Sequence, residues 1–498
     1  MNTHKFLYKI ALCLVAAGIL VGFESCKKDD IAPSKEDAVF VKYYGHVGTQ
    51  QAGDVSQTAD GGYIMLGSTN SYGASTYRDA MVIKTDTAGN ETWSMIYGKG
   101  TVAKNTIVDV RYESYADEIG TKIIELADEA GYILMVNRIY HWDQDQDGSI
   151  VPGRAKILLY HIDIAGAVVL ETELKASDDK SYWGYDIKKT SDGGFVIVGE
   201  TNNVNINKPQ YNSYKEFDKR DIFITRLNAD FTETWASGAA SSQGKGFVGL
   251  DKGVSVEIST DGYYIVVGKV QELDGSTLED NIIVVKYEPS QGGIVNQKTF
   301  GQGVTASAAS SCYDSTTNVL MVLGDFKEGE LKQQLMAFEL DVAGFNLDLI
   351  GSVQEYPGSG NAIAAEFGAG NISAAKKTGA SLVANDVALL SSEDGYLVLA
   401  TNGEANNDLE SQILMFRLGS DLSVATDSEK YFGYNSTDKV YSSTDVGSQI
   451  ITVSEAIEGT TQSQIGAYMF TGTFETGTNQ MIGLVKVKTD GSFNPDEE

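Results

Sequence analysis

The chain has 498 residues, of which 42% are hydrophobic, with 53 glycines, 6 prolines and a formal net charge of -30. This length exceeds one ordinary globular core, so several domains or an array of repeats are expected. The acidity argues against a nucleic-acid partner and against attachment to an anionic membrane surface by charge alone. The three cysteines, Cys13, Cys26 and Cys312, are too few for a disulfide framework, so stability must come from core burial.

The N-terminus carries the features of an export signal. Lys5 and Lys9 lead into an apolar run that is continuous over 10–23, shorter than the roughly 20 residues that span a bilayer. Glu24-Ser25-Cys26 follows, and the arrangement resembles a bacterial lipoprotein signal (residues 1–25) that is cleaved before Cys26. The resemblance implies that Cys26 carries the acyl chains of a membrane anchor. A plain secretory signal or an uncleaved anchor is the alternative.

The acylated cysteine and the residues after it, 26–37, read as a flexible polar tether. The run Cys26-Lys27-Lys28-Asp29-Asp30 resembles the surface-export signal of Bacteroidetes lipoproteins. The resemblance implies an outer-membrane lipoprotein that is exposed on the cell surface and touches the membrane through its lipid anchor only. The alternative is that the run is merely a solvated tether.

From residue 38 onward the chain repeats one pattern of strands and turns. In the first unit, strands are expected over 54–58, 62–67, 79–85 and 92–98, with turn-forming residues between them. No helical periodicity of useful length interrupts them. The turn before the second strand recurs at Asp60-Gly61-Gly62-Tyr63, Asp192-Gly193-Gly194-Phe195, Asp261-Gly262-Tyr263-Tyr264 and Asp394-Gly395-Tyr396.

The third strand of the unit occurs seven times along the chain. Later copies are expected over 155–160, 221–225, 281–285, 335–340, 413–417 and 482–487. Four strands repeated seven times predict an all-β fold, a seven-bladed β-propeller of four-stranded blades. Because the last unit lacks its fourth strand and residues 39–44 match the fourth strands of other units, the N-terminal strand is expected to complete the last blade.

These turns and strands resemble the seven-bladed β-propeller repeat family of bacterial surface and secreted proteins. The resemblance implies one propeller domain over 38–498 and no single activity. Trp93 and Trp235 occupy the same place in the fourth strand of their units, which predicts packing between blades rather than a binding site.

The long connections of the repeat join second to third strands and one blade to the next. Both kinds emerge on the same face of a propeller, where binding sites concentrate. Aromatic residues gather there, in a pattern that suits sugar stacking or a protein hot spot, although the rings can equally serve to pin the loops. The expected ligand face comprises Tyr112, Tyr115, Tyr140, Trp142, Tyr182, Trp183, Tyr211, Tyr214 and Phe217.

One long connection holds a run of alternating carboxylates. Asp143-Gln144-Asp145-Gln146-Asp147-Gly148-Ser149-Ile150 resembles the first part of an EF-hand calcium loop. The resemblance implies a structural Ca²⁺ held by side-chain oxygens of Asp143, Asp145 and Asp147 and by the carbonyl of Ser149. Arg154 stands where the EF-hand has a bidentate glutamate, and no helices are expected around the run. The alternatives are therefore a calcium loop on a hairpin and a solvated acidic hairpin tip.

These features favour a surface-anchored binding or adaptor protein, acting as a monomer, for a glycan or protein partner. An extracellular carbohydrate-active enzyme, a lyase or hydrolase, is the alternative, and a passive structural component of the envelope is a third possibility. No local motif pairs two catalytic carboxylates, and there are only 4 histidines, which favours binding over catalysis. The sequence identifies neither the ligand nor a catalytic residue.

Overall fold

The computed structural model describes residues 39–491, apart from 46, 72–76, 99–115, 128–129, 141, 145–149, 153–154, 176–179, 203–219, 239–249, 275–276, 302–303, 328–332, 357–380, 392, 404–410, 426–427, 433–444, 457–462 and 477–478. The predicted signal peptide, Cys26 and the tether lie outside this part of the chain. Val39–Glu498 forms one structural unit. A search of the described residues finds no helix with the length and apolar character to cross a membrane.

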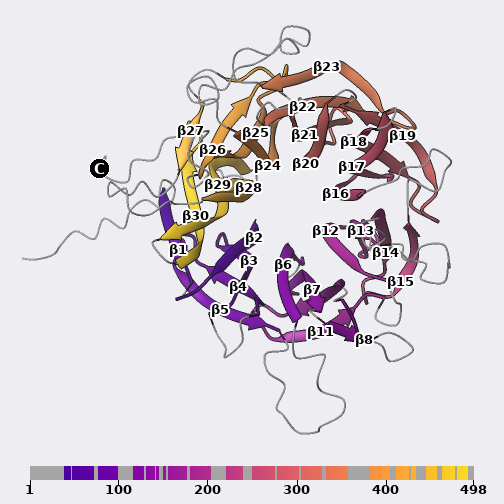
Figure 1. Cartoon of the computed structure of the whole chain (residues 1–498). Helices are drawn as coiled ribbons and strands as arrows, with labels where there is room; N and C mark the ends of the chain where they lie inside the picture. The colour runs from indigo at the N-terminus through magenta and orange to yellow at the C-terminus, as the bar shows by residue number, and fades with distance from the viewer. Residues whose placement is uncertain are drawn as a thin grey trace, which may run out of the picture. The chain divides into compact units, whose positions relative to one another are not determined.

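The unit consists of seven antiparallel sheets of four strands each, arranged as blades around an axis (Figure 1). Blades 1 to 3 are formed by β2 (Gln50–Gln57), β3 (Tyr63–Thr69), β4 (Asp79–Thr85) and β5 (Glu91–Tyr97); β6 (Ala116–Glu125), β7 (Tyr132–Tyr140), β10 (Ala155–Ile162) and β11 (Val168–Glu173); and β12 (Tyr182–Lys189), β13 (Phe195–Thr201), β14 (Asp221–Leu227) and β15 (Glu233–Gly238). Between β7 and β10 lies a two-stranded hairpin of β8 (Trp142–Gln144) and β9 (Ile150–Pro152).

Blades 4 to 7 repeat the pattern, and in each blade the first strand named is the innermost. They are formed by β16 (Lys252–Ile258), β17 (Tyr264–Asp274), β18 (Thr277–Tyr287) and β19 (Ile294–Phe300); β20 (Thr305–Asp314), β21 (Val319–Lys327), β22 (Gln334–Asp341) and β23 (Asp348–Tyr356); β24 (Ser381–Ser391), β25 (Gly395–Gly403), β26 (Ser411–Leu418) and β27 (Lys430–Phe432); and β28 (Val446–Ala456), β29 (Ser463–Thr476), β30 (Asn479–Lys488) and β1 (Phe40–Tyr44). The predicted all-β propeller with seven four-stranded blades is confirmed.

The N-terminal strand closes the ring, as predicted. β1 pairs antiparallel with β30, from Phe40 opposite Lys486 to Tyr44 opposite Ile482. The Tyr44 hydroxyl also donates a hydrogen bond of 2.6 Å to the carbonyl oxygen of Gly89 in blade 1. The first and last strands of the propeller therefore share one sheet, which leaves β30 no free edge.

The recurring Asp-Gly turn is one local structure used in several blades. In blade 1, the Thr58 hydroxyl donates to Asp60, Gly61 has a φ of 80°, and the Lys84 ammonium lies 2.8 Å from the Asp60 carboxylate. A positive φ at this position is reached at little cost by glycine alone. Blade 3 repeats the turn, and there Arg226 forms the ion pair with Asp192. The repeat in the sequence is thus a repeat of turn chemistry.

The hydrophobic core lies between blades, not within one blade. Second and third strands bury both faces, and each apolar cluster takes side chains from adjacent blades, such as Leu66 of blade 1 with Leu134 of blade 2. Trp93 packs against this same cluster, and the Trp235 ring lies 6.1 Å from the Tyr264 ring of blade 4. The predicted packing role of the two tryptophans between blades is confirmed.

Candidate ligand-binding site

The innermost strands all carry a β-bulge at the same place. The pairing register shifts by one residue in β2, β6, β12, β16, β20, β24 and β28. Opposite the bulge the second strand usually has glycine: a Cβ added at Gly199 would overlap the carbonyl oxygen of Trp183, and one at Gly268 would overlap that of Lys252. Where a glycine interrupts the apolar second strand, it therefore makes room for the bulged inner strand.

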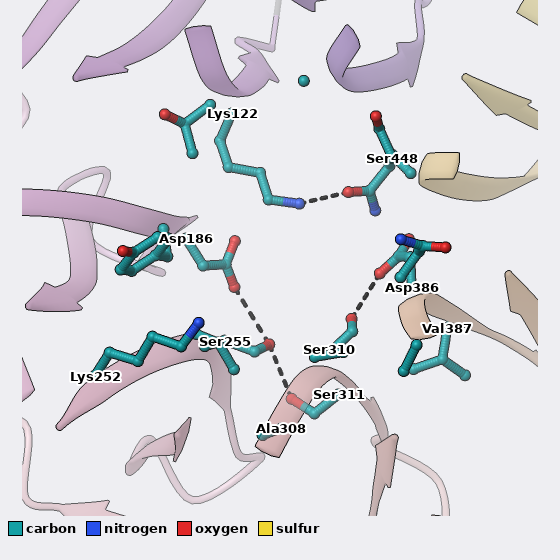
Figure 2. A pocket seen from close by; sticks show the side chains of 18 of the residues that line it. Lys122, Asp186, Lys252, Ser255, Ala308, Ser310, Ser311, Asp386, Val387 and Ser448 are labelled. Atoms are coloured by element: carbon teal, nitrogen blue, oxygen red, sulfur yellow. Dashed lines mark hydrogen bonds between the residues drawn. The ribbon is translucent and has the colours of Figure 1, made fainter. Parts of the chain in front are cut away.

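The first residue after each bulge is polar, and these residues form a ring around the axis, which we call the axial ring. Its members are Asp54, Lys122, Asp186, Ser255, Ser310, Asp386 and Gln449. Figure 2 shows how Lys122, Asp186 and Asp386 converge from different blades. Residues about 70 positions apart in the chain thus meet at one place because the repeat is closed.

The three aspartates of the axial ring join one blade to the next. The backbone N–H of Ile123 donates to Asp54 Oδ2 at 2.8 Å, and Val256 N–H donates to Asp186 Oδ2 at 2.9 Å. A third bond of 2.9 Å runs from Ile450 N–H to Asp386 Oδ2. The three carboxylates are buried, and each satisfies a buried amide of the neighbouring inner strand, so their first role is structural.

Hydroxyl groups and Lys122 complete the axial ring. Ser310 donates to Asp386 at 2.6 Å, and Ser311 donates to Ser255 at 2.9 Å (Figure 2). Lys122 Nζ donates to Gln449 Oε1 at 2.5 Å and lies 3.6 Å from an oxygen of Asp54.

The pKa values of the charged groups in the axial ring are shifted by burial and by the charges that these groups exert on one another. Burial raises the pKa of Asp54 and of Asp386 above the ordinary value. Burial alone lowers the pKa of Lys122, but the carboxylates of Asp54, Asp186 and Asp386 outweigh it and raise that pKa. Lys122 therefore stays charged and acts as the internal counter-ion of the ring.

All members of the axial ring except Asp54 line a cavity of about 710 Å³, to which all seven inner strands contribute. Four carboxylates and three lysines lie in its wall, so its charge is close to balanced although the whole chain carries -30. Lys188 Nζ pairs with Glu257 at 3.1 Å; burial raises the pKa of Glu257, and this carboxylate raises that of Lys188. A cavity of this size with a polar wall suits a small polar ligand.

An aromatic corner occupies the cavity wall in blades 3 and 4. Trp183 and Tyr185, both half-buried on β12, line the cavity. The Arg220 guanidinium lies 4.8 Å from the centre of the Trp183 ring and is paired with Glu200, while Lys252 Nζ lies 5.5 Å from the centre of the Tyr185 ring. The corner therefore offers two ring surfaces beside two cations.

Asp325 adds a carboxyl group with a raised pKa to the cavity wall. It lies on β21 and accepts a hydrogen bond from Gln333 Nε2. Burial raises the pKa of Asp325 to about 6. At neutral pH a fraction of this side chain is protonated, which distinguishes it from an ordinary surface aspartate.

The predicted ligand face is only partly within the described residues. Trp183 lies on the cavity wall, whereas Tyr182 is 5% exposed and packs in the core between blades 2 and 3, with its ring 4.8 Å from that of Phe223. Tyr140 ends β7, and its hydroxyl donates to Glu173 at 2.7 Å. Only the backbone of Trp142 is described, in β8. The remaining residues lie outside the described part: Tyr112, Tyr115, Tyr211, Tyr214 and Phe217.

The acidic run of blade 2 sits on a hairpin, as expected. β8 and β9 pair from Trp142 opposite Pro152 to Gln144 opposite Ile150, with the backbone of Asp143 inside the ladder. The other proposed calcium ligands, Asp145, Asp147 and Ser149, lie outside the described residues. Where side chains are described, no group of three or more histidine, cysteine, aspartate or glutamate residues is placed to hold a metal ion.

Cys312 lies half-buried on β20 and packs against the core beside blade 6. Burial raises the pKa of this thiol well above its ordinary value, which disfavours a nucleophilic thiolate.

The axial ring, Tyr185, Lys252 and Asp325 were not predicted from the sequence. A usable signal exists in five blades: a glycine in the second strand marks the bulge, and the residue after the bulge on the preceding strand is the ring member, whereas blades 2 and 6 have Val136 and Ala400 instead of the glycine. Asp54, Asp186 and Asp386 share this place, but Lys122, Ser255, Ser310 and Gln449 do not resemble them.

Comparison with protein-family models and with curated protein sequences finds no match. Among solved structures, an ulvan lyase of polysaccharide lyase family PL25 is 9% identical with a TM-score of 0.48, over 90% of this chain and 96% of that chain. The NanB sialidase of Streptococcus pneumoniae is 8% identical with a TM-score of 0.39, over 92% of this chain and 70% of that chain. A protein of unknown function from Dyadobacter fermentans is 10% identical with a TM-score of 0.42, over 72% of this chain and 92% of that chain. The fold assignment rests on the strand pairing described above.

Proposed function

We propose that the protein is a binding propeller whose axial cavity takes a saccharide. The observation that carries this proposal is the cavity of about 710 Å³, with Trp183 and Tyr185 in a wall of mixed polar and aliphatic side chains whose charge is nearly balanced. Ligand sites of small molecules have volumes of roughly 300–1,000 Å³. A saccharide offers both a face for aromatic stacking and hydroxyl groups for polar neighbours, so its chemistry matches this wall.

The hydrogen bonding of the axial ring favours binding over catalysis by the ring acids. Asp186 accepts bonds from Ile187 N–H at one oxygen and from Val256 N–H at the other, and Asp386 is likewise occupied by Ser310 and Ile450. A carboxylate that serves as general acid or nucleophile must reach the substrate. These two acids instead hold blades together.

The test is titration calorimetry of the intact protein with a panel of neutral and acidic oligosaccharides. We expect at least one to bind, and Trp183→Ala to weaken that binding by about ten-fold through loss of stacking. Tyr431→Ala, at an exposed tyrosine of the outer strand β27, is the matched control and should bind as the parent does. Absence of binding across the panel, or equal binding by both variants, would count against the proposal.

A second candidate, a carbohydrate-active enzyme, is favoured by one observation. Asp325 lines the cavity with its pKa raised by burial to about 6, which suits a general acid near neutral pH. If the protein cleaves saccharides, new reducing ends should appear on incubation with those that bind, and Asp325→Asn should slow their release by about 100-fold. Bound saccharides that stay intact would remove this candidate.

We propose that the protein is located on the outer face of the outer membrane. Acylation of Cys26 anchors it there, and residues 27–30 direct its export. An antibody against the propeller should then label intact cells, and Cys26→Ala should release soluble protein. Full protection of the parent protein from protease added to intact cells would contradict surface exposure.

We propose that the β8–β9 hairpin binds Ca²⁺ through Asp143, Asp145, Asp147 and Ser149. The β8–β9 pairing brings the two ends of this acidic stretch together. Its three aspartates lie within five residues of the sequence, so their carboxylates repel one another unless a cation or water screens them. Calcium should then raise the melting temperature of chelator-treated protein, and replacement of Asp143 and Asp145 by alanine should remove that rise. If no heat of binding is measured at millimolar calcium, the acidic run is a solvated hairpin tip and not a calcium site.

A further inference from the structure

Lys252 occupies an unfavourable place in the cavity wall. It is the first residue of β16, and its partner across the strand pair is Lys269 of β17. Like charges directly opposite each other on neighbouring strands destabilise a sheet. Lys269 Nζ is neutralised by Asp280, whose carboxylate oxygen lies 2.8 Å away, but this leaves the charge of Lys252 unmatched.

Lys252 is the one cavity lysine without an ion pair in the described part of the chain. Lys122 has Asp54 and Gln449, and Lys188 has Glu257. The described contact of the Lys252 ammonium is with the Tyr185 ring, 5.5 Å from Nζ to the ring centre. The lysine extends from the wall into the cavity (Figure 2).

The neighbouring charges do not neutralise Lys252. Burial, followed by the charge of Lys269, lowers the pKa of Lys252, and the charges of Glu200 and Asp325, which act in the opposite direction, do not offset that effect. Glu200 is already paired with Arg220. An unpaired ammonium in a partly desolvated wall lowers the stability of the folded protein. A residue that lowers stability in this way is a candidate for a binding role.

We propose that Lys252 binds the carboxylate of an acidic saccharide in the axial cavity, with Tyr185 and Trp183 contacting the sugar ring. This inference rests on the proposed function and narrows it from saccharides in general to those that carry a carboxylate. A positively charged donor bonds an anionic oxygen about twice as strongly as a neutral one, so Lys252 gives the site its preference for the acidic sugar.

The charge of the site matches a monoanion better than a phosphate or a polysulfate. The ammonium of Lys252 lacks an ion pair, so one carboxylate is enough to give it a partner, and a dianion would bring a second negative charge into a wall that already holds four carboxylates and three lysines. The remaining surface of a chain with a formal charge of -30 repels polyanions at long range. A sugar with one carboxylate and several hydroxyls satisfies both conditions.

The experiment compares acidic oligosaccharides with the same molecules after reduction of each carboxyl group to an alcohol. Calorimetry is run on the intact protein, on Lys252→Met and on Lys252→Arg, with Lys298→Met as control. Lys298 is an exposed lysine on β19, paired with Asp348 on the neighbouring blade. We expect reduction of the carboxyl and Lys252→Met each to weaken binding by about 10- to 100-fold, Lys252→Arg to retain most of the affinity, and Lys298→Met to retain all of it.

Thermal unfolding of the same variants separates a binding role from a structural one. Because Lys252→Met removes an unpaired charge from a half-buried position, its melting temperature should equal or exceed that of the parent. Three results overturn the inference: reduced and acidic sugars that bind equally, a Lys252→Met variant with unchanged affinity, or one whose stability collapses together with its affinity. Binding of neutral sugars alone defeats this inference and leaves the proposed function standing, whereas binding of no sugar defeats both.

Discussion

The axial ring and the part of the cavity wall around Lys252 and Asp325, which we call the Lys252 corner, use the same kinds of charged side chain but differ in how the charge is compensated. In the axial ring, Asp54 and Asp386 accept backbone N–H bonds from the next blade, and Lys122 balances the carboxylates. In the corner, Lys252 lies opposite Lys269 without a partner of its own, and Asp325 has a pKa raised to about 6 by burial. Paired buried charge joins neighbouring blades at the axis, and the half-buried, unpaired ammonium of Lys252 is where we propose that a ligand binds.

The largest effect is expected from breaking the ring at its closure. Deletion of residues 37–45 removes β1, with the buried aromatic side chains of Phe40 and Tyr44, and exposes the edge of β30. Loss of two such aromatics should cost more than about 4 kcal/mol of unfolding free energy, or cause aggregation through the free edge. Urea unfolding followed by tryptophan fluorescence measures the loss. A deletion that unfolds like the parent would show that closure contributes no stability.

A smaller loss is expected when one blade junction is broken at the axis. Asp54→Ala leaves the buried N–H of Ile123 unpaired and takes a counter-ion from Lys122, so we expect a loss of about 2–4 kcal/mol. Asp230→Ala, in an exposed turn, is the control and should unfold close to the parent. Equal unfolding midpoints for the two variants would mean that the axial ring does not hold the blades.

The pH dependence of stability should show the contribution of the buried Asp325 carboxyl group in the cavity wall. Because burial raises the pKa of Asp325 to about 6, the folded protein binds this proton more tightly than the unfolded chain does. The resulting stabilisation is fully present below about pH 4 and is lost as the pH rises through about 6. Asp325→Asn cannot ionise, so it should gain about 3 kcal/mol relative to the parent between about pH 4 and pH 7.

Urea unfolding of the parent and of Asp325→Asn at several pH values across this range checks the expectation. The difference between the two unfolding free energies is the informative quantity, because the other titrating groups cancel from it. A difference that stays constant with pH would show that Asp325 ionises as an ordinary carboxyl does.

The sequence predicted the blades and their closure because each depends on local patterns. The turn at Asp60, the third strands and the match of residues 39–44 to other fourth strands are short stretches of sequence that can be compared from one repeat to the next. The tryptophans of β5 and β15 were placed between blades for the same reason.

The candidate site could not be predicted from one sequence, because its members come from seven separate strands and differ in residue type. Tyr182 and Trp183 illustrate a second difficulty. Neighbouring residues of a strand face opposite sides, so only one of the pair can line the cavity, and the other enters the core. The bulge at the following residues then resets the alternation, which brings both Tyr185 and Asp186 to the cavity.

We propose that the ligand binds on the axis, and the four tryptophans of the chain can report where binding occurs. Trp183 lines the cavity, Trp93 and Trp235 lie on outer strands, and Trp142 lies on the β8–β9 hairpin. The measurement is fluorine NMR of the protein labelled with fluorotryptophan, with each signal assigned by a Trp→Phe variant, during titration with a saccharide that binds. We expect the chemical shift of the Trp183 signal to change until the site is saturated, while the shifts of Trp93 and Trp235 stay constant. A titration that moves the Trp142 signal and leaves Trp183 unchanged would contradict it.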